Sequence, residues 1–138
     1  MMKSILVGYD ATESAKRALA RAAAIAKAFG SEVTVISVAP LIAGVGRSAG
    51  PIDPTDSVDK HREELADARA LLEGEDVTAS YVPAVGEPAD AIVQLASEAG
   101  VELIVVGTRE PNFVQRLLGQ SVSESVAHKA RCDVLIVH

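Results

Sequence analysis

The residues most able to do chemistry in this sequence lie in the segment 107–122. An apolar run at 103–106 precedes this segment, and a helical pattern begins at Val122, so the segment is predicted to join a strand to a helix N-terminus. In open parallel sheets, ligands bind at the carboxyl ends of strands, beside the N-termini of the following helices. Unpaired N–H groups and the helix dipole favour anions there, phosphate above all. We therefore expect any phosphorylated ligand to bind at this segment.

Two polar side chains next to predicted strand ends have both a structural and a functional interpretation. Ser121 and Glu124 have the spacing of a capping box, which already explains the serine, and a phosphate contact from Ser121 would be additional. Asp10 ends the first predicted strand and could accept hydrogen bonds from a ribose or an adenine amine. It could equally bond the backbone of its own turn. Both interpretations of Asp10 stay open at this point.

The remaining reactive residue types show no catalytic or metal-binding spacing. The three histidines, His61, His128 and His138, lack a partner at metal-ligand spacing and form no Ser-His-Asp pattern, so we expect them on the surface. Cys132 begins an apolar run and is expected to be partly buried, with neighbouring basic residues lowering its pKa somewhat. No nucleophile and base emerge together, and the protein is predicted not to be an enzyme.

Predicted strands and helices alternate along the chain and would position these residues. Strands are expected at 4–9, 32–38, 77–82, 102–106 and 133–137, and helices at 13–29, 59–73, 88–99 and from 122. Such alternation specifies a parallel sheet with helices on both faces and right-handed crossovers. The predicted fold class is α/β, a doubly wound three-layer α/β/α sandwich, as a single domain over residues 1–138. The strand at 77–82 is expected at a sheet edge.

The composition excludes several function classes. With 49% hydrophobic residues but only two Phe, two Tyr and no Trp, the core is expected to be aliphatic. The net charge of −6 argues against nucleic acid or an anionic membrane as a partner. A single cysteine excludes an internal disulfide and fits a reducing compartment. No signal peptide or membrane-spanning run is apparent, so a cytoplasmic location is expected.

The connection over residues 39–57 is long and rich in Gly, Pro, Ala and Ser. Connections of this length in compact domains are usually mobile or functional. The sequence Gly44-Val45-Gly46 resembles part of a phosphate loop, but no helix follows at once. We therefore interpret residues 39–57 as a flexible loop, which limited proteolysis should cut first, near Arg47.

Taken together, several stretches of the chain resemble the universal stress protein family over essentially the full length. They are residues 5–10 (ILVGYD), 14–19 (SAKRAL), 86–89 (GEPA), 103–109 (LIVVGTR), 118–124 (LGQSVSE) and 134–137 (VLIV). The resemblance implies a sheet of strand order 3-2-1-4-5 and a homodimer through the last strand, 133–137. It also implies two branches, one that binds ATP through the motif G-x-x-G-x(9)-G-S/T and one that lacks the motif and does not.

The phosphate half of this motif is altered in the present sequence. Gly107 matches the first glycine and Ser121 matches the Ser/Thr. Glu110 stands where the second glycine is expected, and Gln120 where the third is expected, with Gly119 just before it. The resemblance therefore implies that phosphate contacts differ from those of the ATP-binding branch.

The adenosine half of the motif looks retained. Asp10 matches the family aspartate at the end of the first strand, and Val38 matches the position whose backbone meets adenine, whereas Ala11 replaces a common glycine. Arg109 and Val122 complete the expected site. The resemblance favours a stress-response protein with a degenerate adenine-nucleotide site, in which ATP binding is weak or lost. The alternative is a regulatory module that binds ATP, AMP or cyclic AMP.

Overall fold

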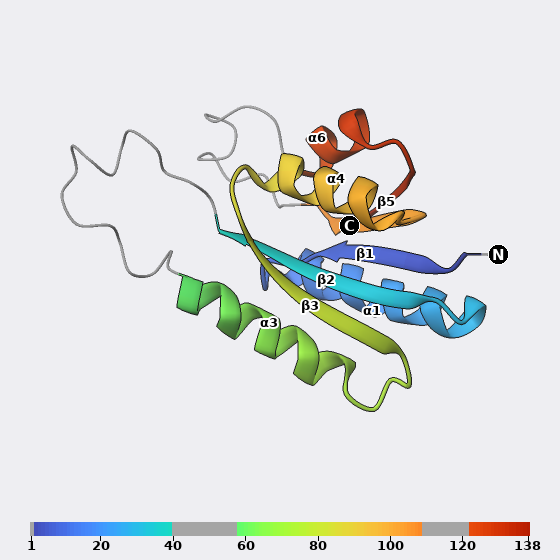
Figure 1. Ribbon diagram of the computed structural model, residues 1–138. Coiled ribbons are helices and arrows are strands. Elements are labelled where there is room, and N and C mark those ends of the chain that lie inside the picture. The colour runs from blue at the N-terminus through green and yellow to red at the C-terminus, as the bar shows by residue number, and fades with distance from the viewer. Residues whose placement is uncertain (1, 40–57, 109–121) are drawn as a thin grey trace.

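The protein forms a five-stranded parallel sheet with strand order β3-β2-β1-β4-β5 (Figure 1). The structure is a computed structural model, and it describes residues 2–39, 58–108 and 122–138. The strands are β1 (Ser4–Gly8), β2 (Glu32–Ala39), β3 (Thr78–Val85), β4 (Leu103–Gly107) and β5 (Asp133–Val137). The predicted fold class and strand order are confirmed.

Helices cover both faces of the sheet, as the alternation predicted (Figure 1). Helices α1 (Glu13–Phe29) and α3 (Val58–Leu72) pack on one face, and α4 (Pro88–Ala99) and α6 (Val122–Lys129) pack on the other. Within the described residues, no helix is long and apolar enough to cross a membrane.

Strand alternation divides the core between the two faces. Ile5 and Val7 of β1, and Tyr9 just after it, pack toward α1 and α3, whereas Leu6 packs toward α4 and α6. The same alternation sends Val35 of β2 to the first face and Ile36 to the second. The clusters are almost entirely aliphatic, as the composition predicted.

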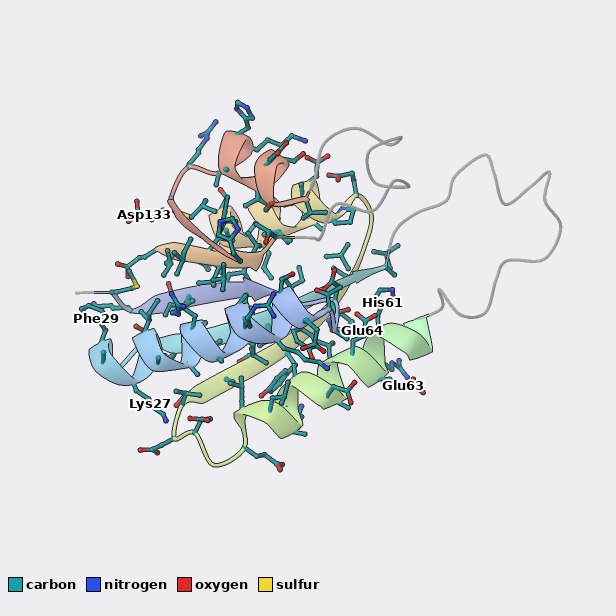
Figure 2. All side chains as sticks on the ribbon, turned by 180° about the vertical axis from the view of Figure 1, so that it is seen from behind. Lys27, Phe29, His61, Glu63, Glu64 and Asp133 are labelled. Atoms are coloured by element: carbon teal, nitrogen blue, oxygen red, sulfur yellow. The ribbon has the colours of Figure 1, made fainter. Side chains whose placement is uncertain are left out.

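Helix α1 begins and ends where its capping residues predict. The Thr12 side chain accepts a hydrogen bond from the Ala15 N–H at the N-terminus, and Gly30 adopts φ 68° at the C-terminus. The four- and three-residue spacing of Ala15, Leu19, Ala22, Ala26 and Phe29 predicts one buried helical face. The structure buries the first four of these residues, but the prediction is wrong for Phe29, the last residue of α1, which is 49% exposed. Figure 2 shows the Phe29 side chain at the C-terminal end of α1.

Strand β3 lies at the sheet edge, as predicted, and it contains Pro83. The N–H of Gly86 donates to the Ala39 carbonyl at 2.9 Å, so the even-numbered N–H groups of β3 face β2. Position 83 therefore points its backbone nitrogen away from the sheet, where a missing N–H costs no ladder bond. Proline at an outward-facing edge position also disfavours pairing with another strand.

Two predictions concern the connections. Ala39 was expected to begin the long loop, but it is the last residue of β2 and pairs with Val85. The rest of the predicted flexible loop, 40–57, lies outside the described residues. The same holds for 109–121 in the segment that was expected to hold phosphate.

Candidate functional site

A small cavity of about 60 Å³ lies where β1, β2 and β4 reach their carboxyl ends. It brings together four of the predicted site residues: Asp10, Val38, Gly107 and Val122. The other lining residues are Gly8, Tyr9, Ala15, Ile36, Pro88, Ile92 and Val106. The remaining predicted site residues, Arg109, Gly119, Gln120 and Ser121, lie outside the described part of the chain.

The backbone of Val38 is available at this cavity because β2 is longer than β1. The pairing of β1 with β2 ends with Gly8 opposite Ile36, followed by a bond of 2.9 Å from Tyr9 N to the Ile36 carbonyl. Backbone polar groups alternate in direction along a strand, so the N–H and C=O of Val38 face the same side as those of Ile36. They do so beyond the end of β1, where an adenine edge could meet them.

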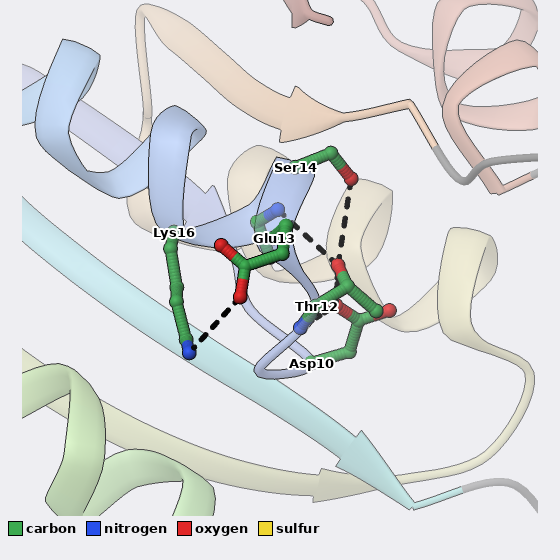
Figure 3. A network of polar contacts seen from close by, with 6 residues as sticks. Asp10, Thr12, Glu13, Ser14 and Lys16 are labelled. Carbon is green, nitrogen blue, oxygen red and sulfur yellow. Dashed lines mark hydrogen bonds and ion pairs between the residues drawn. The ribbon is translucent and has the colours of Figure 1, made fainter.

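Asp10 is tied into the turn that joins β1 to α1 (Figure 3). Its Oδ1 accepts hydrogen bonds from Thr12 N at 3.1 Å and from Thr12 Oγ1 at 2.6 Å. Thr12 Oγ1 in turn accepts a bond of 3.2 Å from Ala15 N. The structural interpretation of Asp10 is therefore correct for this oxygen, and the bonds fix the direction of the carboxylate at the cavity rim.

Ala11, at the position where the sequence resemblance implies glycine, adopts a left-handed backbone with φ 63°. This conformation costs a residue with a Cβ about 1–2 kcal/mol relative to the right-handed one. The tight turn between β1 and α1 is thus kept in spite of the substitution, with some strain stored beside Asp10.

Gly107, at the end of β4, is needed for packing. A Cβ at this position would lie 2.5 Å from the backbone carbon and oxygen of Ser14 and 2.8 Å from Ala15 N. Backbone atoms of a capped helix cannot move aside as a flexible side chain can. The retention of this glycine is therefore explained by the close approach of β4 to α1, whatever binds at the cavity.

The N-terminus of α4 reaches the cavity through Pro88 and is acidic. The Glu87 side chain caps the helix by accepting a bond of 2.8 Å from Asp90 N. Asp90 Oδ1 also accepts a bond of 2.6 Å from Lys129 Nζ, which raises the pKa of Lys129. The two carboxylates in this first turn make α4 a poor place for an additional anion.

On the opposite face of β2, Ser37, His61 and Glu64 form a buried polar cluster. The prediction that all three histidines lie on the surface is wrong for His61, which is only 7% exposed. Ser37 Oγ lies 2.8 Å from His61 Nδ1 and donates to Glu64 Oε2 at 3.0 Å. Figure 2 shows His61 and Glu64 together on α3.

This cluster does not have the geometry of a catalytic triad. A triad places the serine and the carboxylate on opposite nitrogens of the imidazole ring. Here Ser37 Oγ and Glu64 Oε2 both lie at Nδ1, the latter at 3.3 Å, and Ser37 is fully buried. An attacking hydroxyl would have neither a base at the right atom nor access to a substrate.

The remaining reactive side chains are the possible metal ligands and Cys132. Within the described residues, no group of His, Cys, Asp and Glu side chains could hold a metal ion. Cys132 is partly buried, as predicted, but burial and the neighbouring Asp133 raise its pKa. The prediction that basic neighbours lower this pKa is wrong, because burial of the thiol has the larger effect.

The fold and the cavity define a doubly wound α/β protein with a candidate ligand site at the carboxyl edge of its parallel sheet. The chain belongs to the universal stress protein family, whose profile matches residues 1–138. The resemblance found in the sequence is thereby confirmed.

Individual relatives agree with this assignment. A Thermus aquaticus protein named "Universal stress protein in QAH/OAS sulfhydrylase 3'region" is 34% identical, over 99% of both chains. A crystal structure of a universal stress protein in complex with cAMP is 30% identical, covers 99% of this chain and 97% of its own, and has a TM-score of 0.76. A universal stress protein from Archaeoglobus fulgidus in complex with dAMP is 26% identical, covers 100% and 98%, and has a TM-score of 0.74.

Proposed function

We propose that this stress-response protein binds adenine nucleoside monophosphates at the carboxyl edge of the sheet and binds ATP weakly or not at all. Asp10 would hold the ribose and the Val38 backbone the adenine, and Gly107 and Val122 would complete the floor. The observation that carries the proposal is the overhang of β2 beyond β1, which directs the polar groups of Val38 toward the cavity. The complexes of relatives with cAMP and dAMP support the choice of ligand.

Charge in the segment 107–122 is the reason to expect weak ATP binding. Glu110 and Gln120 stand where the ATP-binding branch of the family has glycines. Glycines let backbone N–H groups approach phosphate oxygens without a Cβ in the way. Two like charges about 4 Å apart repel by roughly 1 kcal/mol in water and roughly 4 kcal/mol at an effective dielectric constant near 20. The penalty should grow with phosphate charge, so AMP should suffer less than ATP.

The packing role of Gly107 strengthens this interpretation. Of the motif glycines, it alone is kept at its own position, and its retention follows from contact with the α1 backbone. It is therefore no sign that phosphate binding has been retained.

The second candidate is a regulatory module that binds ATP, AMP or cyclic AMP with ordinary affinity. Calorimetry with AMP, cyclic AMP and ATP on the wild type and on the double variant Glu110→Gly with Gln120→Gly distinguishes the two. We expect the double variant to gain more affinity for ATP than for AMP. Tight ATP binding by the wild type would favour the second candidate. An unchanged ATP affinity in the double variant would show that Glu110 and Gln120 are not the residues that weaken ATP binding.

We also propose that the protein acts as a cytoplasmic homodimer and does not catalyse a reaction. Strand β5 lies at a sheet edge, with Leu135 and Ile136 only partly buried. Antiparallel pairing of β5 with a second copy would cover this apolar edge by a self-complementary contact. Light scattering should report a dimer at micromolar protein and a monomer for Leu135→Asp, whereas Glu32→Asp, on the exposed start of β2, should stay dimeric. A wild type that stays monomeric at high concentration would refute the dimer.

A further inference from the structure

The buried cluster of Ser37, His61 and Glu64 is held together by a fixed order of hydrogen bonds. Ser37 has one hydroxyl proton, which it donates to Glu64 Oε2 at 3.0 Å. Ser37 Oγ then accepts from His61 Nδ1–H at 2.8 Å. His61 Nε2 is buried without a partner among the described residues, so the ring is held through Nδ1. Two side chains of α3 thus bond one hydroxyl of β2.

The Ser37 hydroxyl lies on the part of β2 that extends beyond the end of β1. Strand β1 pairs with β2 only as far as Ile36, so the last three residues of β2, Ser37–Ala39, are paired on one side, with β3. Strand β3 is itself the edge of the sheet. The contacts of Ser37 with α3 therefore anchor a strand end that the sheet supports only on its outer side.

We propose that Ser37, fixed by His61 and Glu64, is a positioning residue that holds the end of β2 in place for ligand binding at Val38. Neighbouring strand residues point to opposite faces, so the Ser37 side chain is bonded behind the sheet while Val38 lines the cavity in front. A shift of Ser37 moves the peptide group that it shares with Val38. The effect on ligand binding rests on the proposed adenine site, whereas the anchoring of β2 does not.

The test compares Ser37→Val with Ser37→Thr, because valine and threonine have nearly the same shape and differ in the hydroxyl. The first measurement is amide hydrogen exchange in the protein without ligand. The amide of Ala39, which faces β3, reports on the strand end, and those of Leu6 and Val7 report on the core. For Ser37→Val we expect exchange at Ala39 to rise about tenfold over Ser37→Thr, the order expected for the loss of one buried hydrogen bond. Exchange at Leu6 and Val7 should be equal in the two variants.

The second measurement is AMP affinity by calorimetry. Ser37→Val should bind AMP about tenfold more weakly than Ser37→Thr if the anchoring acts on the site. The matched control is the same pair of substitutions at Ser80, an exposed residue of β3, which should change neither measurement. Valine and threonine are both larger than serine, so a third variant controls for disturbance of the core. Ser37→Ala removes the hydroxyl without adding volume, and compared with the wild type it should show the same changes that Ser37→Val shows compared with Ser37→Thr.

The outcomes separate the anchoring from the proposed function. Equal exchange at Ala39 in the hydroxyl and non-hydroxyl variants would overturn the anchoring. A local rise in exchange with unchanged AMP affinity would overturn the positioning role. A wild type that binds no AMP would refute the proposed function, and with it the role in binding, while the exchange measurement still decides whether Ser37 anchors β2.

Discussion

Gly107→Ala tests whether this glycine serves packing or ligand binding. The added Cβ would lie 2.5 Å from the carbonyl group of Ser14, and 2.8 Å from Ala15 N. Ordinary contacts of a carbon atom are about 3.5–4.0 Å, so β4 and α1 must separate by about 1 Å at this point. Forcing extra volume into a packed core typically costs 1–3 kcal/mol, and we expect a loss of about this size in the free energy of unfolding without any nucleotide present.

Gly8→Ala is the matched control for this substitution. A Cβ at Gly8 would lie 2.9 Å from Ile92 Cδ1 and 3.3 Å from Val106 Cγ1. The nearer atom is the end of a flexible side chain, which can change rotamer, so we expect a loss below about 1 kcal/mol.

Urea denaturation, with the slope compared between variants, measures both effects. If Gly107→Ala is as stable as the wild type, the packing explanation is wrong. If Gly107→Ala is as stable as the wild type but binds AMP more weakly, the glycine serves the ligand.

Three further substitutions or reactions probe features of the fold. Ala11→Gly should stabilise the protein by up to about 1 kcal/mol in urea denaturation, because relief of the left-handed backbone at φ 63° exceeds the entropy that glycine adds to the unfolded chain; a clear destabilisation would contradict this. Tyr9→Phe should be neutral or stabilising by up to about 1 kcal/mol, since the buried Tyr9 hydroxyl has no hydrogen-bond partner among the described residues. Burial, followed by nearby carboxylates, raises the pKa of Tyr9, so the wild type should lose stability above about pH 10, where the unfolded tyrosine ionises first, and Tyr9→Phe should lose less. Cys132 should react with iodoacetamide more slowly in the folded protein than in urea at pH 8, because its pKa is raised; equal rates would refute this.

The order of elements was predictable because local signals mark the helix ends and the apolar runs of the strands, although β3 runs to Val85, past its predicted end at 82. Thr12, Gly30, Pro88 and Gly100 cap or begin helices as their residue types suggest. Strand β5 has the bounds predicted from its apolar run. These signals depend on a few neighbouring residues, so one sequence is enough to find them.

The buried polar cluster was missed because it depends on a contact between distant elements. Helix α3 is rich in charge, which is typical of a helix that faces solvent, and His61 was expected on the surface. One signal was present: His61 and Glu64 fall on the same helical face as Leu65, Ala68 and Leu72, which are buried. A second was Ser37, a polar residue in a strand rich in β-branched residues, which needs partners once the strand is buried on both faces. Only the register between α3 and β2 shows that these partners are His61 and Glu64.

The packing role of Gly107 could not be predicted from the sequence either. The resemblance assigned this glycine to phosphate binding, whereas its nearest neighbours are backbone atoms of α1, more than ninety positions earlier in the chain. A motif residue can thus be kept for a reason that no motif records.

The unequal lengths of β1 and β2 have a consequence for how such proteins diverge. The step that they leave at the sheet edge is a property of the scaffold, and it exposes peptide groups able to pair with a purine base. On the function proposed above, this step would recognise the base, whereas the family motif assigns recognition of the triphosphate to the residues between β4 and α6. Base recognition and charge recognition would then be inherited separately. Substitutions in that one connection would change which nucleotide is bound, while the step that pairs with the base stays in place.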